Sequence, residues 1–162
     1  MSELSALMDQ LHSRDNRLAY ASLQRLLAES ENNDAVYAYW DTVAAMMDSH
    51  NAYVRTRGLL LLTANVRWDR EHRLDVLLPA YLSHIQDAKP VTARQFIQAL
   101  PTVGQVRPDL IPALRDALAN ADLSGYPDSM APLVAKDICG TLQQLDQLEA
   151  ARAAKGTEWS AE

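Results

Sequence analysis

Residues 51–62 read NAYVRTRGLLLL, and this stretch decides the fold because the pattern around it recurs along the chain. The segment 38–55, moved forward by 39 residues, aligns without a gap on the segment 77–94. A period of this length is typical of proteins built from repeated pairs of α-helices, which bury their apolar faces only by stacking on their neighbours. We therefore expect the four leucines at 59–62 to pack between neighbouring repeats.

Charged residues recur with the same period. The alignment places Asp48 on Asp87 and Arg55 on Arg94, and in the following copy Lys136 takes the place of the arginine. One interpretation is a ladder in which each cation pairs with the aspartate that precedes it and so sets the register between repeats. The alternative is a column of cations that lines a concave face and holds a phosphate, a carboxylate or an acidic peptide.

Apolar residues follow helical spacing along almost the whole chain, and five glycines are too few for a protein rich in tight β-turns. We expect an all-α fold, a right-handed α-α superhelix of about eight helices in four repeats. The expected helix pairs span 2–29, 33–67, 71–104 and 107–148, in a single domain at 1–149 that a frayed polar tail at 150–162 follows. The side chains expected to be mostly buried are Trp40, Leu61, Leu62, Leu82, Phe96, Ile97, Leu114, Leu133 and Ile138.

The period, the aspartate that ends the first helix of a pair and the Val-Arg or Ala-Arg that opens the second resemble HEAT repeats. Several short motifs between residues 50 and 145 carry a closer resemblance. They are the segments 53–57, 67–69, 81–84, 87–90, 92–95, 98–101 and 136–138. In these motifs the chain resembles a family of small bacterial HEAT-like (armadillo-like) proteins, some of which are labelled SufBD. The resemblance implies the helical repeat fold and no catalytic residues.

Charge is distributed unevenly over the chain. The net charge is −6, yet residues 55–107 carry 8 basic and 4 acidic side chains. A basic region in an acidic protein favours an acidic protein or peptide as the partner, bound on the concave face. The candidate binding residues are Arg55, Arg57, Arg67, Trp68, Arg70, Arg94 and Lys136.

Trp68 lies between arginines and has two interpretations. Its ring either closes the core at a repeat joint or stacks on a base or a peptide side chain. Stacking on a base leads to the alternative function, a nucleic-acid-binding protein similar to the HEAT-like alkylpurine DNA glycosylases, which handle a damaged base with a basic concave face, aromatic residues and an aspartate. The nearest candidates for those roles here are Trp68, Asp69, Arg55 and Arg94.

No catalytic motif, phosphate loop or zinc spacing occurs in the sequence, so we expect a non-catalytic protein without cofactor or metal. His84 and Asp87 are one helical turn apart, which indicates a hydrogen bond or, alternatively, a pair of metal ligands. The single Cys139 is expected to be a buried, inert thiol. No segment is apolar over a length that spans a bilayer, which favours a cytoplasmic protein without membrane contact.

Overall fold

The computed structural model describes the backbone of residues 2–160 and the side chains of residues 2–156. Every regular element in this part of the chain is helical, so the all-α prediction is confirmed. The residues form two compact units, unit 1 (Met1–Tyr81) and unit 2 (Leu82–Glu162). None of the described helices is long and apolar enough to cross a membrane.

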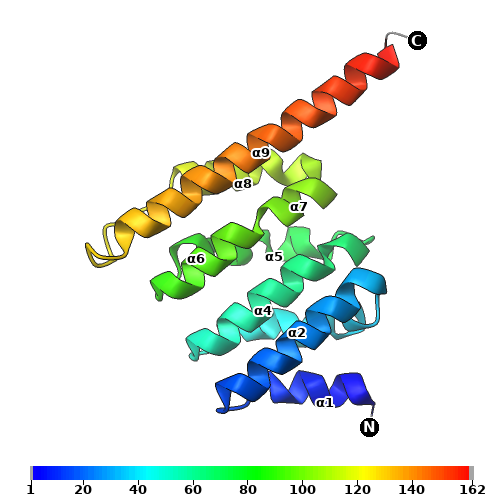
Figure 1. Cartoon of the computed structure of the whole chain (residues 1–162), viewed down its shortest axis with the longest axis vertical. Coiled ribbons are helices and arrows are strands. Elements are labelled where there is room, and N and C mark those ends of the chain that lie inside the picture. Colours follow the sequence, from blue (N-terminus) through cyan, green and yellow to red (C-terminus); the bar gives the residue numbers. More distant parts are fainter. Residues whose placement is uncertain (1, 161–162) are drawn as a thin grey trace. The chain divides into compact units, whose positions relative to one another are not determined.

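Unit 1 is a set of helices joined by short turns (Figure 1). Its elements are α1 (Glu3–Gln10), α2 (Asn16–Asn32), η1 (Val36–Tyr39), α3 (Trp40–Ala45), η2 (Met46–Asp48), α4 (Ala52–Asn65), η3 (Val66–Trp68) and α5 (Arg73–Leu82), whose last residue belongs to unit 2. The η elements are 3-10 helices. Helices α2 and α4 lie side by side and both begin on the left of Figure 1.

Unit 2 continues with η4 (Ser83–Gln86), α6 (Pro90–Ala99), α7 (Pro101–Val106), η5 (Pro108–Leu110), α8 (Ile111–Ala119) and α9 (Ala131–Ser160). Helix α9 packs against α6, α7 and α8. Residues 150–156 of the predicted polar tail are helical and their side chains are exposed, and residues 161–162 of that tail lie outside the described residues. Alanine, arginine and lysine are strong helix formers, which explains why the helix continues beyond its packed part.

The turns before α2 and α4 are closed by the same polar pattern. Ser13 Oγ accepts a hydrogen bond from the backbone N–H of Asp15 (3.0 Å), and Ser49 Oγ accepts one from Asn51 (3.1 Å). Asp15 and Asn51 in turn accept from backbone N–H groups in the first turn of the helix that follows. Each turn therefore satisfies helix donors that would otherwise lack a partner.

Helix α4 approaches α3 and η2 closely at Gly58. A Cβ placed on Gly58 would lie 2.6 Å from the Cβ of Met46 and 3.2 Å from the carbonyl oxygen of Val43. Only glycine allows this approach, because neither a Cβ nor a backbone carbonyl can rotate away. The leucines that follow are the centre of unit 1: Leu59, Leu61 and Leu62 are at most 1% exposed, while Leu60 is half-buried.

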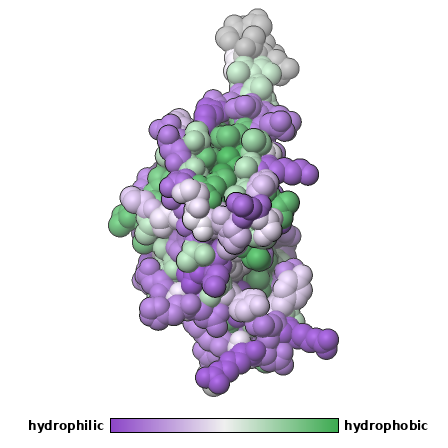
Figure 2. All heavy atoms as spheres, turned by 90° about the vertical axis from the view of Figure 1, so that its left-hand side faces the viewer, coloured by the Kyte–Doolittle hydropathy of each residue, from purple (hydrophilic) through white to green (hydrophobic). Residues whose placement is uncertain are grey.

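Most of the predicted core is confirmed. The residues Trp40, Leu61, Leu62, Phe96, Ile97, Leu114 and Ile138 are buried. Leu82 is half-buried, and the predictions for Leu133 and Cys139 are wrong. Leu133 is 39% exposed and Cys139 is exposed, because each lies one residue, or about 100° of helix, from the buried face of α9 that Val134 and Ile138 define. Figure 2 shows an apolar area on the surface, in the upper part of the view.

The close approach at Gly58 leads to a test with an internal control. We expect Gly58→Ala to destabilise the protein by about 1–3 kcal/mol, because the added methyl overpacks a rigid contact. Gly140→Ala in α9 places its methyl in open space, so it should stabilise by about 0.5–1 kcal/mol through helix propensity. Urea unfolding of both variants measures these changes. A Gly58→Ala protein at least as stable as the wild type would contradict the rigid contact.

Candidate functional site

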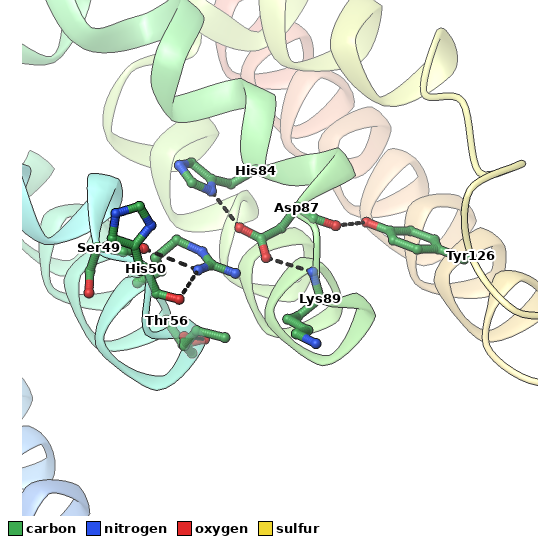
Figure 3. A network of polar contacts seen from close by, with 9 residues as sticks. Ser49, His50, Thr56, His84, Asp87, Lys89 and Tyr126 are labelled. Atoms are coloured by element: carbon green, nitrogen blue, oxygen red, sulfur yellow. Dashed lines mark hydrogen bonds and ion pairs between the residues drawn. The ribbon is translucent and has the colours of Figure 1, made fainter. Parts of the chain in front are cut away.

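Arg55 does not form the predicted pair with Asp48. Its Nη1 donates to the carbonyl oxygens of Ser49 (3.1 Å) and His50 (3.2 Å), both in the turn before α4 (Figure 3). Asp48 is exposed at the end of η2. The local ion pair is therefore wrong for this position, and Arg55 helps to hold the turn instead.

Arg94 also has a different partner from the predicted Asp87. Its Nε donates to Asp137 Oδ2 at 2.6 Å, which joins α6 to α9 in unit 2. The side chain of Arg94 is 33% exposed and that of Asp137 12%. Lys136, the third member of the predicted column, is exposed on α9. Two of the three predicted cations thus bind neighbouring parts of the chain.

Asp87 holds the turn between η4 and α6 (Figure 3). It is buried, and its carboxylate accepts hydrogen bonds from the backbone N–H of Lys89 (2.9 Å) and from His84 Nδ1 (2.7 Å). An ionised carboxylate can only accept, so Nδ1 of His84 carries the proton. The Asp87 carbonyl accepts from the Tyr126 hydroxyl at 2.6 Å. The predicted hydrogen bond between His84 and Asp87 is confirmed, and both residues serve the fold.

Trp68 packs at a joint of unit 1, as one of its two interpretations predicted. It is half-buried, and its indole Nε1 donates to the carbonyl oxygen of Ser30 at 2.7 Å. The guanidinium of Arg67 lies 5.4 Å from the Trp68 ring centroid, a cation–π distance. Arg67 and Arg70 are both exposed. Among the candidate binding residues, Arg67, Arg70 and Lys136 therefore present their charge to solvent.

Asp69 is a structural residue as well. It is 4% exposed and accepts from the backbone N–H groups of Arg73 and Leu74, both at 2.9 Å, so it caps the start of α5. The Tyr37 hydroxyl donates to the same carboxylate at 2.7 Å. Burial and the contact with this carboxylate raise the pKa of Tyr37. A carboxylate with three donors is held in place and is not free to act on a substrate.

Arg57 differs from the other predicted site residues. It is only 6% exposed, and it donates to two uncharged acceptors, the carbonyl oxygen of Leu11 (2.8 Å) and Asn16 Oδ1 (3.1 Å). These bonds join α4 to the turn between α1 and α2. Among the described side chains no carboxylate contacts Arg57. A buried guanidinium therefore keeps its charge without a counter-ion.

Arg107 in unit 2 shows the usual arrangement. It is 7% exposed, and its Nε and Nη2 donate to the two carboxylate oxygens of Asp109 at 3.0 and 2.8 Å. Burial in apolar surroundings lowers the pKa of Arg57, and the neighbouring Tyr53 opposes that change. The guanidinium of Arg57 nevertheless remains charged at any physiological pH. The two buried arginines thus differ in whether an anion compensates the charge.

Two exposed tyrosines lie on the helices that form the α2–α4 face, the surface along which these two helices lie side by side: Tyr53 on α4 and Tyr20 on α2. Tyr53 is 61% exposed, one turn before Arg57 on α4, and its ring centroid is 5.8 Å from the guanidinium. Tyr20 is 62% exposed and lies one turn after Asn16, on the same side of α2. Sequence analysis missed both tyrosines as site residues. Their helical phase relative to the buried residues was the signal that could have found them.

No group of three or more metal-binding side chains comes together in the part of the chain that the structure describes. The arrangement around Arg57 is one of donors and exposed aromatic rings, which suits binding of an anionic group next to apolar atoms. Comparison of the chain with protein-family models, curated proteins and solved structures finds no significant match.

The Arg94–Asp137 pair leads to a double-mutant test. We expect Arg94→Ala and Asp137→Ala each to lower the melting temperature slightly, because each removes the same charge-assisted bond between α6 and α9. The double variant should lose less stability than the two single losses together. Lys136→Ala, an exposed neighbour on α9, is the control and should melt like the wild type. Strictly additive losses would show that the pair contributes no coupling.

The hydroxyl of Tyr126 makes a contribution to stability that depends on pH in the alkaline range. Burial, together with the charge of Asp87, raises the pKa of Tyr126 to about 12. The stability that its neutral hydroxyl contributes is complete below pH ~10, the ordinary tyrosine value, and is lost as pH rises through the folded pKa. We expect the wild type to be more stable than Tyr126→Phe at pH 8 and this advantage to disappear towards pH ~12. Urea unfolding of both proteins across this range measures it. An advantage that is constant with pH would contradict the raised pKa.

Proposed function

We propose that the protein is a non-catalytic interaction module that binds an acidic segment of a partner protein on the α2–α4 face of unit 1. The observation that carries the proposal is the buried, uncompensated charge of Arg57, with the exposed Tyr53 next to it and the exposed Tyr20 one turn after its partner Asn16. Tyrosine and arginine are enriched in protein interfaces because they combine apolar contact with directed hydrogen bonds. A carboxylate on the partner would supply the negative charge that compensates Arg57, which the fold itself does not supply.

The proposal includes the arrangement of the helices, which we propose to be a HEAT-like superhelix. Consecutive helices pack together, as α1 with α2 and α3 with α4 do, and helices farther apart in the chain also lie side by side, with α2 beside α4 in unit 1 and α6 beside α9 in unit 2. This arrangement supports repeated helix pairs. In such repeats the second helices form the binding surface, and the proposed face consists of two of them. The superhelix, the resemblance to small bacterial HEAT-like proteins and the cytoplasmic location stay predictions.

Nucleic-acid binding is less well supported as an alternative. The residues on which this alternative rested form contacts within the fold: Trp68 donates a hydrogen bond to Ser30, and Asp69 caps α5. Arg94 is paired with Asp137. Much of the positive charge of residues 55–107 is thus used in contacts within the fold.

The proposal is tested with three labelled decapeptides that share one apolar sequence. They differ only at the same chosen positions, which hold glutamate in the first peptide, glutamine in the second and lysine in the third. Fluorescence anisotropy measures their binding to the full chain. We expect the glutamate peptide to bind at least about tenfold more tightly than the other two, since only it neutralises Arg57. Tyr20→Ala and Tyr53→Ala should each weaken that binding by roughly tenfold, with the unfolding midpoint unchanged.

Val76→Ala is the matched control, because Val76 is 85% exposed on α5 of the same unit and lies outside the proposed face. Its peptide binding should equal that of the wild type. Equal binding of all three peptides, or no effect of the tyrosine changes, would overturn the proposed function. Tight, steeply salt-dependent binding of a duplex DNA in place of the peptides would favour the alternative.

A further inference from the structure

Arg57 has the chemistry of a receptor for one specific anion. We propose that it binds a single carboxylate group of the partner, an aspartate or glutamate side chain, and that this bond decides which acidic segments the α2–α4 face accepts. The inference rests on the proposed function and adds the recognised group and the residue that recognises it.

The donors of Arg57 are only partly used. A guanidinium has five N–H donors, and the hydrogen bonds to Leu11 and Asn16 take one from Nη1 and one from Nη2. Three N–H groups, including that on Nε, have no hydrogen-bond partner among the described residues. Because both acceptors are uncharged, they hold the side chain in place without neutralising it. The remaining donors suit the two oxygens of a carboxylate.

A carboxylate fits this position better than a phosphate. A phosphate monoester carries close to two negative charges at neutral pH and is usually bound by several cations or by free helix N-termini. Here the first N–H groups of α2 and α4 are already capped by Asp15 and Asn51. The carboxylate of Asp15 would also repel a dianion near the start of α2. One buried cation matches one negative charge.

The neighbouring tyrosines define the rest of the ligand. Tyr53, next to Arg57, is 61% exposed, and Tyr20, one turn after Asn16, is 62% exposed. A segment whose carboxylate reaches Arg57 would lay its adjacent residues on these rings. The partner sequence that fits is thus one acidic residue next to apolar or aromatic residues, and a run of acidic residues gains nothing further.

Nitrogen-15 NMR of the arginine side chains tests this directly in the full chain. The Nε–H signals of Arg57 and Arg107 are assigned from their loss in Arg57→Lys and Arg107→Lys. Sodium acetate, sodium phosphate and sodium chloride are then titrated at matched ionic strength. We expect acetate to shift the Arg57 signal saturably and chloride to leave it unchanged. Arg107, which Asp109 already neutralises, should respond to none of the salts.

An equal response of the two arginines to acetate, or no response of Arg57, overturns the inference. A response of Arg57 to phosphate at lower concentration than to acetate overturns the carboxylate assignment. Binding of the glutamate peptide also separates the two proposals. Tyrosine-dependent peptide binding that leaves the Arg57 signal unchanged overturns this inference alone. A saturable acetate shift of Arg57, with no binding of any peptide, supports the carboxylate site and overturns the interaction module alone.

Discussion

The contact that positions the rest of unit 1 is the close approach of α4 to α3 and η2 at Gly58. With no side chain at that position, the α4 backbone comes so near that a single Cβ would meet Met46 at 2.6 Å. Neighbouring residues of a helix point about 100° apart, so the orientation of Gly58 also determines where Arg57 points. With Gly58 directed at η2, Arg57 reaches the turn between α1 and α2. The position of the candidate site therefore follows from a packing constraint and not from its own polar contacts.

The partners of the arginines explain why the sequence predicted the wrong ion pairs. The expected pairs joined residues only seven positions apart. The observed contacts join residues much farther apart in the chain: Arg57 meets Asn16 across 41 residues, and Arg94 meets Asp137 across 43. In stacked helix pairs, side chains on equivalent helices of successive repeats face one another, so partners are separated by the repeat length. The 39-residue shift that aligns 38–55 on 77–94 was visible in the sequence, and it is close to these separations.

Helices and core positions were predictable because periodic apolar residues report directly on which side of a helix is buried. Residues such as Leu61, Phe96 and Ile97 occupy the centres of such faces, and all three are buried. Residues at the edge of a face, such as Leu133 and Cys139, are not decided by composition, because a shift of one residue moves them into solvent. The site depends on the same kind of detail. Tyr20 and Tyr53 are unremarkable in the sequence, and only their exposure marks them, Tyr53 beside the buried Arg57 and Tyr20 one turn after its partner Asn16.

An uncompensated buried charge costs stability, so its presence requires a physical explanation. The transfer of a cation from water into a protein interior is unfavourable, and a paired arrangement such as that of Arg107 with Asp109 reduces this cost. Arg57 instead relies on two uncharged acceptors, which fix its orientation and leave its charge available. Because the side chain is already immobile, an arriving anion does not have to order it. The surface arginines Arg67 and Arg70 lack this property: water screens their charge, and their side chains would lose freedom on binding. Selective recognition of one carboxylate is thus better supported at the buried arginine than at the exposed ones, although the exposed residues dominate the charge pattern of the sequence.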